Sequence, residues 1–131
     1  MAAPLKVRKH RNKSSSFGPE SEIQICFIKW LRLTNKAVGS VTFSVPNGAL
    51  RSLAEGKRQK DMGLTAGIPD IFIAYPSGKF HGMFIEFKAG VNTLTPNQKT
   101  MIELLKAQNY HCVVCYEVDK AMQEVANYLR C

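Results

Sequence analysis

The sequence contains no uninterrupted apolar run near the roughly 18 residues that a membrane-spanning helix requires. Its first residues also lack an apolar segment of the signal-peptide type. We therefore expect no contact with a membrane and a cytoplasmic location. No internal repeat is visible, and a chain of 131 residues fits one domain with a modest core.

Acidic residues are scarce, with 10 Asp and Glu against 18 Lys and Arg, and the net charge is +8. No acid precedes Glu20, whereas the first residues include Lys6, Arg8, Lys9, Arg11 and Lys13. We predict that residues 1–18 form a flexible basic arm and that residues 19–131 form the folded domain. Nucleic acid is the expected partner of the arm, because release of counterions would favour binding. A solubilising tail and an organelle transit peptide are the alternatives.

Cysteine and histidine patterns that bind metals are missing. Cys112 and Cys115 form the only Cys-x-x-Cys pair, and they lie in an apolar run that is typical of a buried strand. Residues three apart in a strand point to opposite faces, so the two thiols should diverge. We expect all four cysteines to be ordinary buried thiols in a reducing compartment. The histidines His10, His81 and His111 are scattered and are predicted to be structural.

The remaining pattern alternates between helical and strand periodicity. It predicts a helix from Pro19 to about residue 35, a strand at 40–45, a short helix and a loop within 49–68, strands at about 70–75 and 81–88, a helix at 94–109, a strand at 111–118 and a C-terminal helix. The last helix has a predicted apolar stripe of Met122, Val125, Ala126 and Leu129. This order favours an α/β fold, with a mixed sheet of about four strands flanked by helices.

Charged residues interrupt the two central strands. If the hairpin is symmetric about Gly78, Asp70 faces Glu86, and their Cβ atoms are about 4.5–5.5 Å apart on one face of the sheet. Lys88 lies two residues beyond Glu86 and projects to the same face, whereas Phe87 points to the opposite face. The sequence therefore predicts two carboxylates and an ammonium group in one small region.

Two ionised carboxylates at that separation repel each other, and a divalent cation between them would remove the repulsion. Oxygen ligands of this kind suit Mg²⁺ or Mn²⁺. A nearby ammonium group can orient a water molecule or stabilise negative charge that develops on a phosphate. The set fits metal-assisted hydrolysis of phosphodiesters. The alternative is an Asp at a strand end and a Glu–Lys pair on a solvated sheet face.

Asp70 after Pro69, followed by Glu86-Phe87-Lys88 on the next strand, resembles the PD-(D/E)xK nuclease motif. The wider series of blocks reads "VPNG", "MGLTAGIPDIFIA", "HGMFIEFKAG" and "LTPNQ". Over about residues 20–129 it resembles the virus-type replication-repair nuclease (VRR-NUC) family, in its small stand-alone phage form. The position before the G-x-PD element, where a basic string is expected, reads "LTAG". The resemblance implies a restriction-endonuclease-like core.

The resemblance also implies roles for individual residues. Asp70 and Glu86 match the carboxylates that bind Mg²⁺ or Mn²⁺, and the backbone carbonyl of Phe87 would be a further ligand. Lys88 matches the catalytic lysine, which would position the attacking water. Gln98 matches a glutamine at the start of the following helix, where a capping box with Thr95 is an equal alternative.

Glu20 resembles an acid of the first helix that points into the same site, and Glu22 competes for this role. Asn47 is a candidate contact, although "PNG" is also a common turn. The candidate DNA-phosphate contacts are Arg51, Lys57, Arg58 and Lys60. A solvated surface is the alternative for these four.

By the same resemblance the chain would be a homodimeric, metal-dependent DNA endonuclease in a bacterial or phage-infected cell. Its expected substrate is branched DNA such as a four-way (Holliday) junction. A non-catalytic DNA-binding module and a nuclease acting on flaps or RNA are the alternatives. The intact Asp, Glu and Lys set argues against the binding module, because two clustered acids would weaken contact with phosphate.

Overall fold

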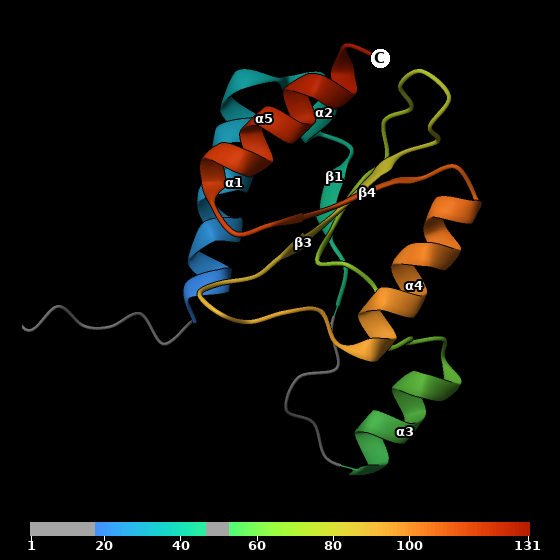
Figure 1. Ribbon diagram of the computed structural model, residues 1–131. Helices are drawn as coiled ribbons and strands as arrows, with labels where there is room; N and C mark the ends of the chain where they lie inside the picture. The colour runs from blue at the N-terminus through green and yellow to red at the C-terminus, as the bar shows by residue number, and fades with distance from the viewer. Residues whose placement is uncertain (1–17, 47–52) are drawn as a thin grey trace, which may run out of the picture.

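The structure is a computed structural model that describes residues 18–46 and 53–131. Its elements are α1 (Pro19–Thr34), α2 (Lys36–Gly39), β1 (Thr42–Ser44), α3 (Leu53–Asp61), β2 (Ile71–Ile73), β3 (Met83–Phe87), α4 (Pro96–Ala107), β4 (His111–Cys115) and α5 (Val118–Leu129) (Figure 1). The predicted α/β class is confirmed, and α2 is the one element in these ranges that was not predicted. The predicted arm, apart from Gly18, lies outside the described residues. None of the described helices is both long and apolar enough to cross a membrane.

The four strands form one sheet in the order β1-β2-β3-β4. β1, β2 and β3 are antiparallel neighbours, and β4 runs parallel to β3 after the crossover through α4. Ile71 pairs with Ile85 and Phe72 with Phe84, which is the register that symmetry about Gly78 predicts. The faces assigned to the residues of this hairpin are therefore confirmed.

One face of the sheet carries the hydrophobic core. In Figure 1, α1 and α5 lie on one side of the strands and α4 lies on the other. Ile85 and Phe87 of β3 are fully buried on the first side, and Phe27 of α1 packs against Phe87 with ring centroids 5.7 Å apart. Because side chains alternate along a strand, Phe84 and Glu86 point to the α4 side.

The α4 side of the sheet carries a row of aromatic rings. Phe72 stacks on Phe84 with ring centroids 4.5 Å apart, and Phe43 and Tyr110 contact this pair edge to face. Glu86 is the next residue after Phe84 on this face. The candidate site therefore lies at one end of an apolar surface, where a carboxylate is poorly solvated.

Two sequence predictions are corrected. In α5 the buried residues are Ala121, Val125 and Tyr128, whereas Ala126 of the predicted stripe is exposed. The stripe is displaced because the Tyr128 ring is buried and its hydroxyl donates a hydrogen bond to the carbonyl oxygen of Tyr75 at 2.6 Å.

The prediction that all the cysteines are buried is also corrected. Cys26, on the solvent side of α1, and Cys131, at the chain end, are exposed.

Candidate active site

Asp70 and Glu86 are brought together by the β2–β3 pairing. Asp70 immediately precedes β2, and one of its carboxylate oxygens, Oδ2, accepts a hydrogen bond from the backbone N–H of Phe87 at 2.8 Å. This bond ties the Asp70 side chain to the residue that follows Glu86. The negative charge of Asp70 also contributes to a raised pKa of Glu86, as expected for neighbouring carboxylates.

The Glu86 carboxylate is buried, and its two oxygens have different surroundings. The residue is 3% exposed. Its Oε1 atom accepts a hydrogen bond from Nε2 of Gln98 at 3.0 Å and lies 3.6 Å from Nζ of Lys88. Its Oε2 atom is buried and has no hydrogen-bond partner among the residues that the structure describes. Burial, followed by the charge of Asp70, raises the pKa of Glu86 to about 7, and Lys88 opposes this shift.

The unsatisfied oxygen provides a test of whether a cation fits here. A buried carboxylate oxygen without a partner is costly, and coordination of a metal ion is one way to remove that cost. The available donors are the carboxylates of Asp70 and Glu86 and the backbone carbonyl of Phe87, all of them hard oxygens. Within the described ranges no three His, Cys, Asp or Glu side chains gather to hold a metal ion. By their chemistry, the two carboxylates and the carbonyl suit a hard divalent cation.

Lys88 is buried beside these carboxylates. It is 7% exposed, and its backbone N–H donates a hydrogen bond to the carbonyl oxygen of Cys115 at 3.0 Å. This bond continues the β3–β4 ladder by one residue and holds the Lys88 backbone in place. A lysine is seldom buried unless it is paired, and here the partner is Glu86.

Gln98 forms the capping box that the sequence predicted as one alternative, and its side chain also contacts Glu86. Its side-chain Oε1 accepts a hydrogen bond from the backbone N–H of Thr95 at 2.9 Å, and its own N–H donates to Oγ1 of Thr95 at 3.2 Å. These two bonds form the capping box of α4. The other end of the Gln98 amide donates to Glu86, so one side chain links the helix cap to the site.

Of the two helix acids, Glu20 has a clear connection to the loop after β3. Its Oε1 atom accepts a hydrogen bond from Nδ2 of Asn92 at 3.1 Å, and the Asn92 carbonyl accepts one from the Tyr116 hydroxyl at 2.7 Å. Figure 1 shows the first turn of α1 beside the end of β3. Glu22 is exposed. Sequence reasoning missed Asn92, because nothing in its neighbourhood marks a contact across 72 residues.

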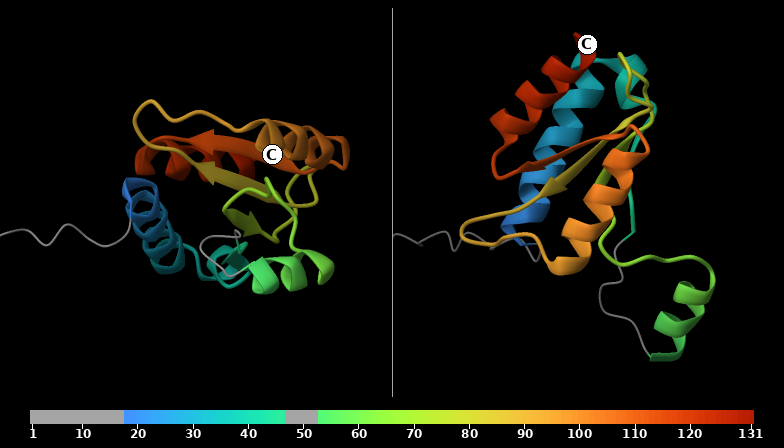
Figure 2. Two further views of the ribbon diagram at one scale, coloured as in Figure 1. Left: turned by 90° about the horizontal axis from the view of Figure 1, so that it is seen from below. Right: turned by 45° about the vertical axis from the view of Figure 1, so that its right-hand side comes forward.

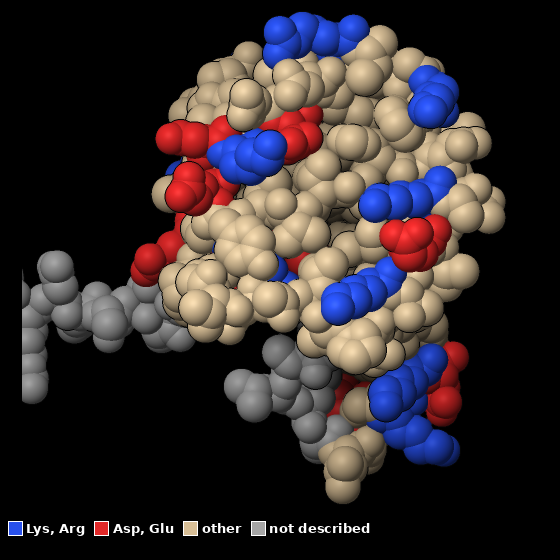
Figure 3. All heavy atoms as spheres, viewed as in Figure 1, with Lys and Arg blue, Asp and Glu red and all other residues tan. Residues whose placement is uncertain are grey.

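The predicted phosphate contacts lie on a projecting helix. Lys57, Arg58 and Lys60 are exposed on α3, which has no buried residue and stands away from the sheet in Figure 1 and in the right-hand view of Figure 2. In Figure 3 this end of the molecule shows basic and acidic atoms side by side. Asn47 and Arg51 lie outside the described residues. The structure brings Asp70, Glu86, Lys88, Phe87 and Gln98 together and leaves the α3 residues apart from them.

The turn before Asp70 requires a glycine at position 67. Its φ angle is +85°, and a Cβ atom there would lie 2.5 Å from the backbone carbonyl oxygen of Asn97. The turn thus packs directly on the first turn of α4, which carries Gln98. A side chain at this position would push α4 and the Asp70 strand apart.

We expect Gly67→Ala to lower the free energy of unfolding by at least about 3 kcal/mol, because backbone strain and overpacking add. Gly90→Ala is the matched control, since Gly90 has a φ of +58° but open space around it. That control should lose only about 1–2 kcal/mol. Urea unfolding of both variants checks the difference. Equal losses would contradict the importance of the close approach to α4.

A mixed four-stranded sheet flanked by helices, with Asp70 just before β2, Glu86 on β3 and Lys88 just after it, is consistent with a PD-(D/E)xK nuclease fold. The family model of the VRR-NUC domain matches residues 7–119, and the chain belongs to this nuclease family. The match begins inside the predicted arm and ends in the first turn of α5.

A solved structure described as a "VRR_NUC domain protein" is similar to this chain. It is 28% identical in sequence, with a TM-score of 0.75, and the alignment covers 87% of this chain and 90% of that chain. The comparison with curated proteins found no match. The fold and the family therefore rest on two independent comparisons that agree.

Proposed function

We propose that this VRR-NUC protein is a Mg²⁺- or Mn²⁺-dependent DNA endonuclease that hydrolyses phosphodiester bonds in branched DNA such as four-way junctions. The observation that carries the proposal is the buried, unpartnered Oε2 atom of Glu86 beside Asp70 and Lys88. A structural ion pair would satisfy both oxygens of its carboxylate. Coordination of a cation would satisfy the oxygen that is left without a partner among the described residues.

In this proposal the cation is held by Asp70, Glu86 and the carbonyl oxygen of Phe87. When bound, it supplies polarisation of the scissile phosphate and a lowered pKa for a bound water. Gln98 engages Oε1 of Glu86 and so leaves Oε2 for the ligand role. The Phe87 N–H holds Asp70, and in this proposal the Lys88 ammonium, 3.6 Å from Oε1 of Glu86, would orient the attacking water.

The preference for branched DNA rests on the resemblance and on charge. A net charge of +8 favours a polyanion, and the exposed cations of α3 offer phosphate contacts next to the turn that leads to Asp70. Asn47 and Arg51 are proposed to extend this contact. We propose a homodimer, because two sites related by two-fold symmetry suit a symmetric four-way junction.

The test is cleavage of an end-labelled four-way junction, with linear duplex, 5′ flap and stem-loop RNA as controls. Wild type and Asp70→Ala are compared in Mg²⁺, Mn²⁺ and EDTA, and the mass in solution is measured by light scattering. We expect paired, metal-dependent nicks across the junction from a dimer, and no nicks from Asp70→Ala. Binding without cleavage on every substrate and in every metal would instead indicate a non-catalytic module.

A further inference from the structure

The outer face of α1 carries cations that no part of the described chain neutralises. Lys29, Arg32 and Lys36 are exposed; Lys29 and Arg32 lie three residues apart on one side of α1, and Lys36, in α2 after the extended residue Asn35, lines the same surface hollow as Arg32. Within the described ranges none of them forms an ion pair, whereas Lys106 and Lys120 pair with Glu103 and Glu124. The face therefore keeps its full positive charge available.

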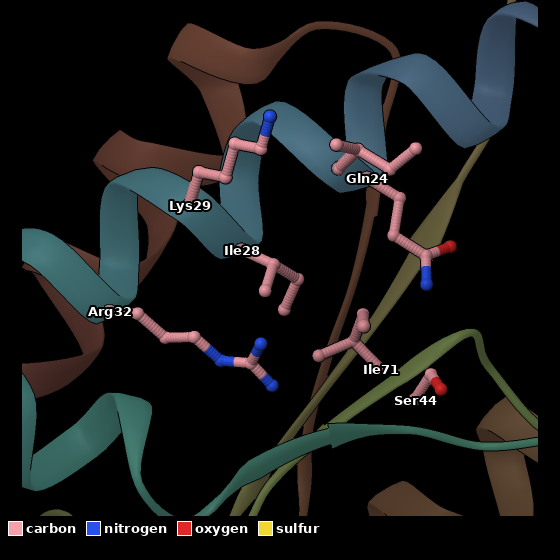
Figure 4. Close-up of a pocket in the computed structure, with 7 residues that line it drawn as sticks. Gln24, Ile28, Lys29, Arg32, Ser44 and Ile71 are labelled. Carbon is pink, nitrogen blue, oxygen red and sulfur yellow. The ribbon is translucent and has the colours of Figure 1, made fainter.

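A cavity of about 340 Å³ lies under this face, between α1 and strands β1 and β2. Its lining residues are Gln24, Ile25, Ile28, Lys29, Arg32, Ser44 and Ile71. In Figure 4 the Gln24 amide and the Arg32 guanidinium group point into the space from opposite ends, and the side chain of Ile28 points between them. A second hollow of about 220 Å³ continues past Arg32 to Lys36.

The cavity adjoins the candidate active site through the backbone. Ile71 follows Asp70 directly and pairs with Ser44 of β1. The next residue, Val45, donates its N–H to the carbonyl oxygen of Asp70 at 2.8 Å. On the helix, Gln24 lies one turn beyond Glu20. Because side chains alternate along a strand, Ile71 lines the cavity on the α1 side of the sheet, whereas Asp70 projects to the α4 side, so the cavity and the carboxylates lie on opposite faces of the same strand.

The chemistry of this surface fits a nucleic-acid strand. Three unpaired cations in a row can contact successive phosphates, and Arg32 lies at the boundary between the row and the cavity. The cavity has apolar walls from Ile25, Ile28 and Ile71, which suit the face of a base. Its amide, guanidinium and hydroxyl groups are the kinds of group that hydrogen-bond base edges. An acidic ligand without an apolar part would make no apolar contact with Ile25, Ile28 and Ile71.

We infer that this face of α1 binds one strand of the DNA, on the opposite side of the sheet from Asp70 and Glu86, with phosphates on Lys29, Arg32 and Lys36 and one unpaired base in the cavity. The inference takes DNA as the ligand from the proposed function but does not depend on cleavage. A base enters the cavity only where it is not paired and stacked, as in a flap or at a branch point that the protein opens. The cavity would therefore help the protein to distinguish branched from linear DNA.

The phosphate contacts are tested by fluorescence anisotropy with a labelled oligothymidylate in EDTA at several salt concentrations. The variant Lys29→Ala/Arg32→Ala/Lys36→Ala is compared with Lys79→Ala/Lys106→Ala/Lys120→Ala, which removes equal charge from other surfaces. Each single-strand phosphate contact contributes about 0.7 to the slope of log K against log salt. We expect the α1 variant to lose about 2 from this slope and the control to retain the wild-type slope.

The base contact is tested separately with Ser44→Trp, which fills the cavity from an exposed position on β1. We expect about tenfold weaker binding of the oligothymidylate, an unchanged salt slope and unchanged binding of linear duplex. Phe43→Trp, on the opposite face of the same strand, is the control. Thermal melting confirms that each variant is folded before binding is compared.

Equal slopes for the two triple variants, or wild-type affinity in Ser44→Trp, would overturn the inference. If the wild type cuts junctions while the triple variants behave alike, the α1 contact is wrong and the proposed function stands. If binding depends on the α1 face but no metal supports cleavage, the contact stands and the proposed function is wrong. The two proposals therefore fail in distinguishable ways.

Discussion

Replacing Lys88 by methionine is expected to reduce the rate of DNA cleavage by at least about 100-fold while leaving the fold intact. Methionine retains the length and packing of the buried stem and removes only the ammonium group. That group lies 3.6 Å from Oε1 of Glu86 in a poorly solvated site, where the loss of a charge has a large effect on a developing phosphate charge. Single-turnover cleavage of the junction at saturating protein measures the effect.

Lys79→Met is the matched control, because Lys79 is exposed and its ammonium lies 5.4 Å from the centre of the Phe80 ring, at the β2–β3 turn. It should cleave like the wild type. Lys88 also lowers the pKa of Glu86, so the residual activity of Lys88→Met should increase towards higher pH, as Glu86 loses its proton. A Lys88→Met protein that cuts at the wild-type rate would remove Lys88 from the catalytic site.

Replacing Glu86 by glutamine is expected to have opposite effects on activity and stability. Cleavage should be lost, because the amide removes the carboxylate that would hold the cation. In the metal-free protein the free energy of unfolding should increase by about 1–3 kcal/mol at pH 8, since a buried charged oxygen without a partner is replaced by a neutral group. Urea unfolding of both proteins at pH 5 and pH 8 measures the change.

The pH dependence of this gain follows from the raised pKa of Glu86, about 7 against a usual value of 4.5. Between these values the folded protein holds a proton on Glu86 that the unfolded chain releases, so wild-type stability falls as the pH rises through this window. The advantage of Glu86→Gln should thus be small at pH 5 and complete above pH 7. Glu103→Gln, on the exposed surface of α4, is the control and should show no such trend.

The effect of Mg²⁺ on stability provides a further test of whether Glu86 holds the cation. Added Mg²⁺ should stabilise the wild type, because a ligand that binds only the folded state shifts the unfolding equilibrium. It should have little effect on Glu86→Gln. If Mg²⁺ stabilises both proteins equally, the cation binds elsewhere, and Glu86 is not its ligand.

Much of the fold follows from local patterns. The β2–β3 register was predictable because the side-chain period of a strand is two, so a symmetric turn at Gly78 determines which residues face each other. The cap of α4 was predictable because Thr95 and Gln98 lie at the spacing of a capping box, which involves only neighbouring residues. The α5 stripe was misplaced by one residue because Tyr128 is drawn inward by a bond to Tyr75, 53 positions away.

The sequence by itself determined which residue types are available and on which face of each strand they lie, including the Asp, Glu and Lys set. Only the tertiary structure decided how those groups are solvated. The Oε2 atom of Glu86 lacks a hydrogen-bond partner among the described residues because the packing of the strands and α4 buries it. The periodicity of the sequence does not encode this burial. The cavity beneath Lys29 and Arg32 likewise exists only because α1 packs beside Ser44 and Ile71, residues that lie far from it in the chain.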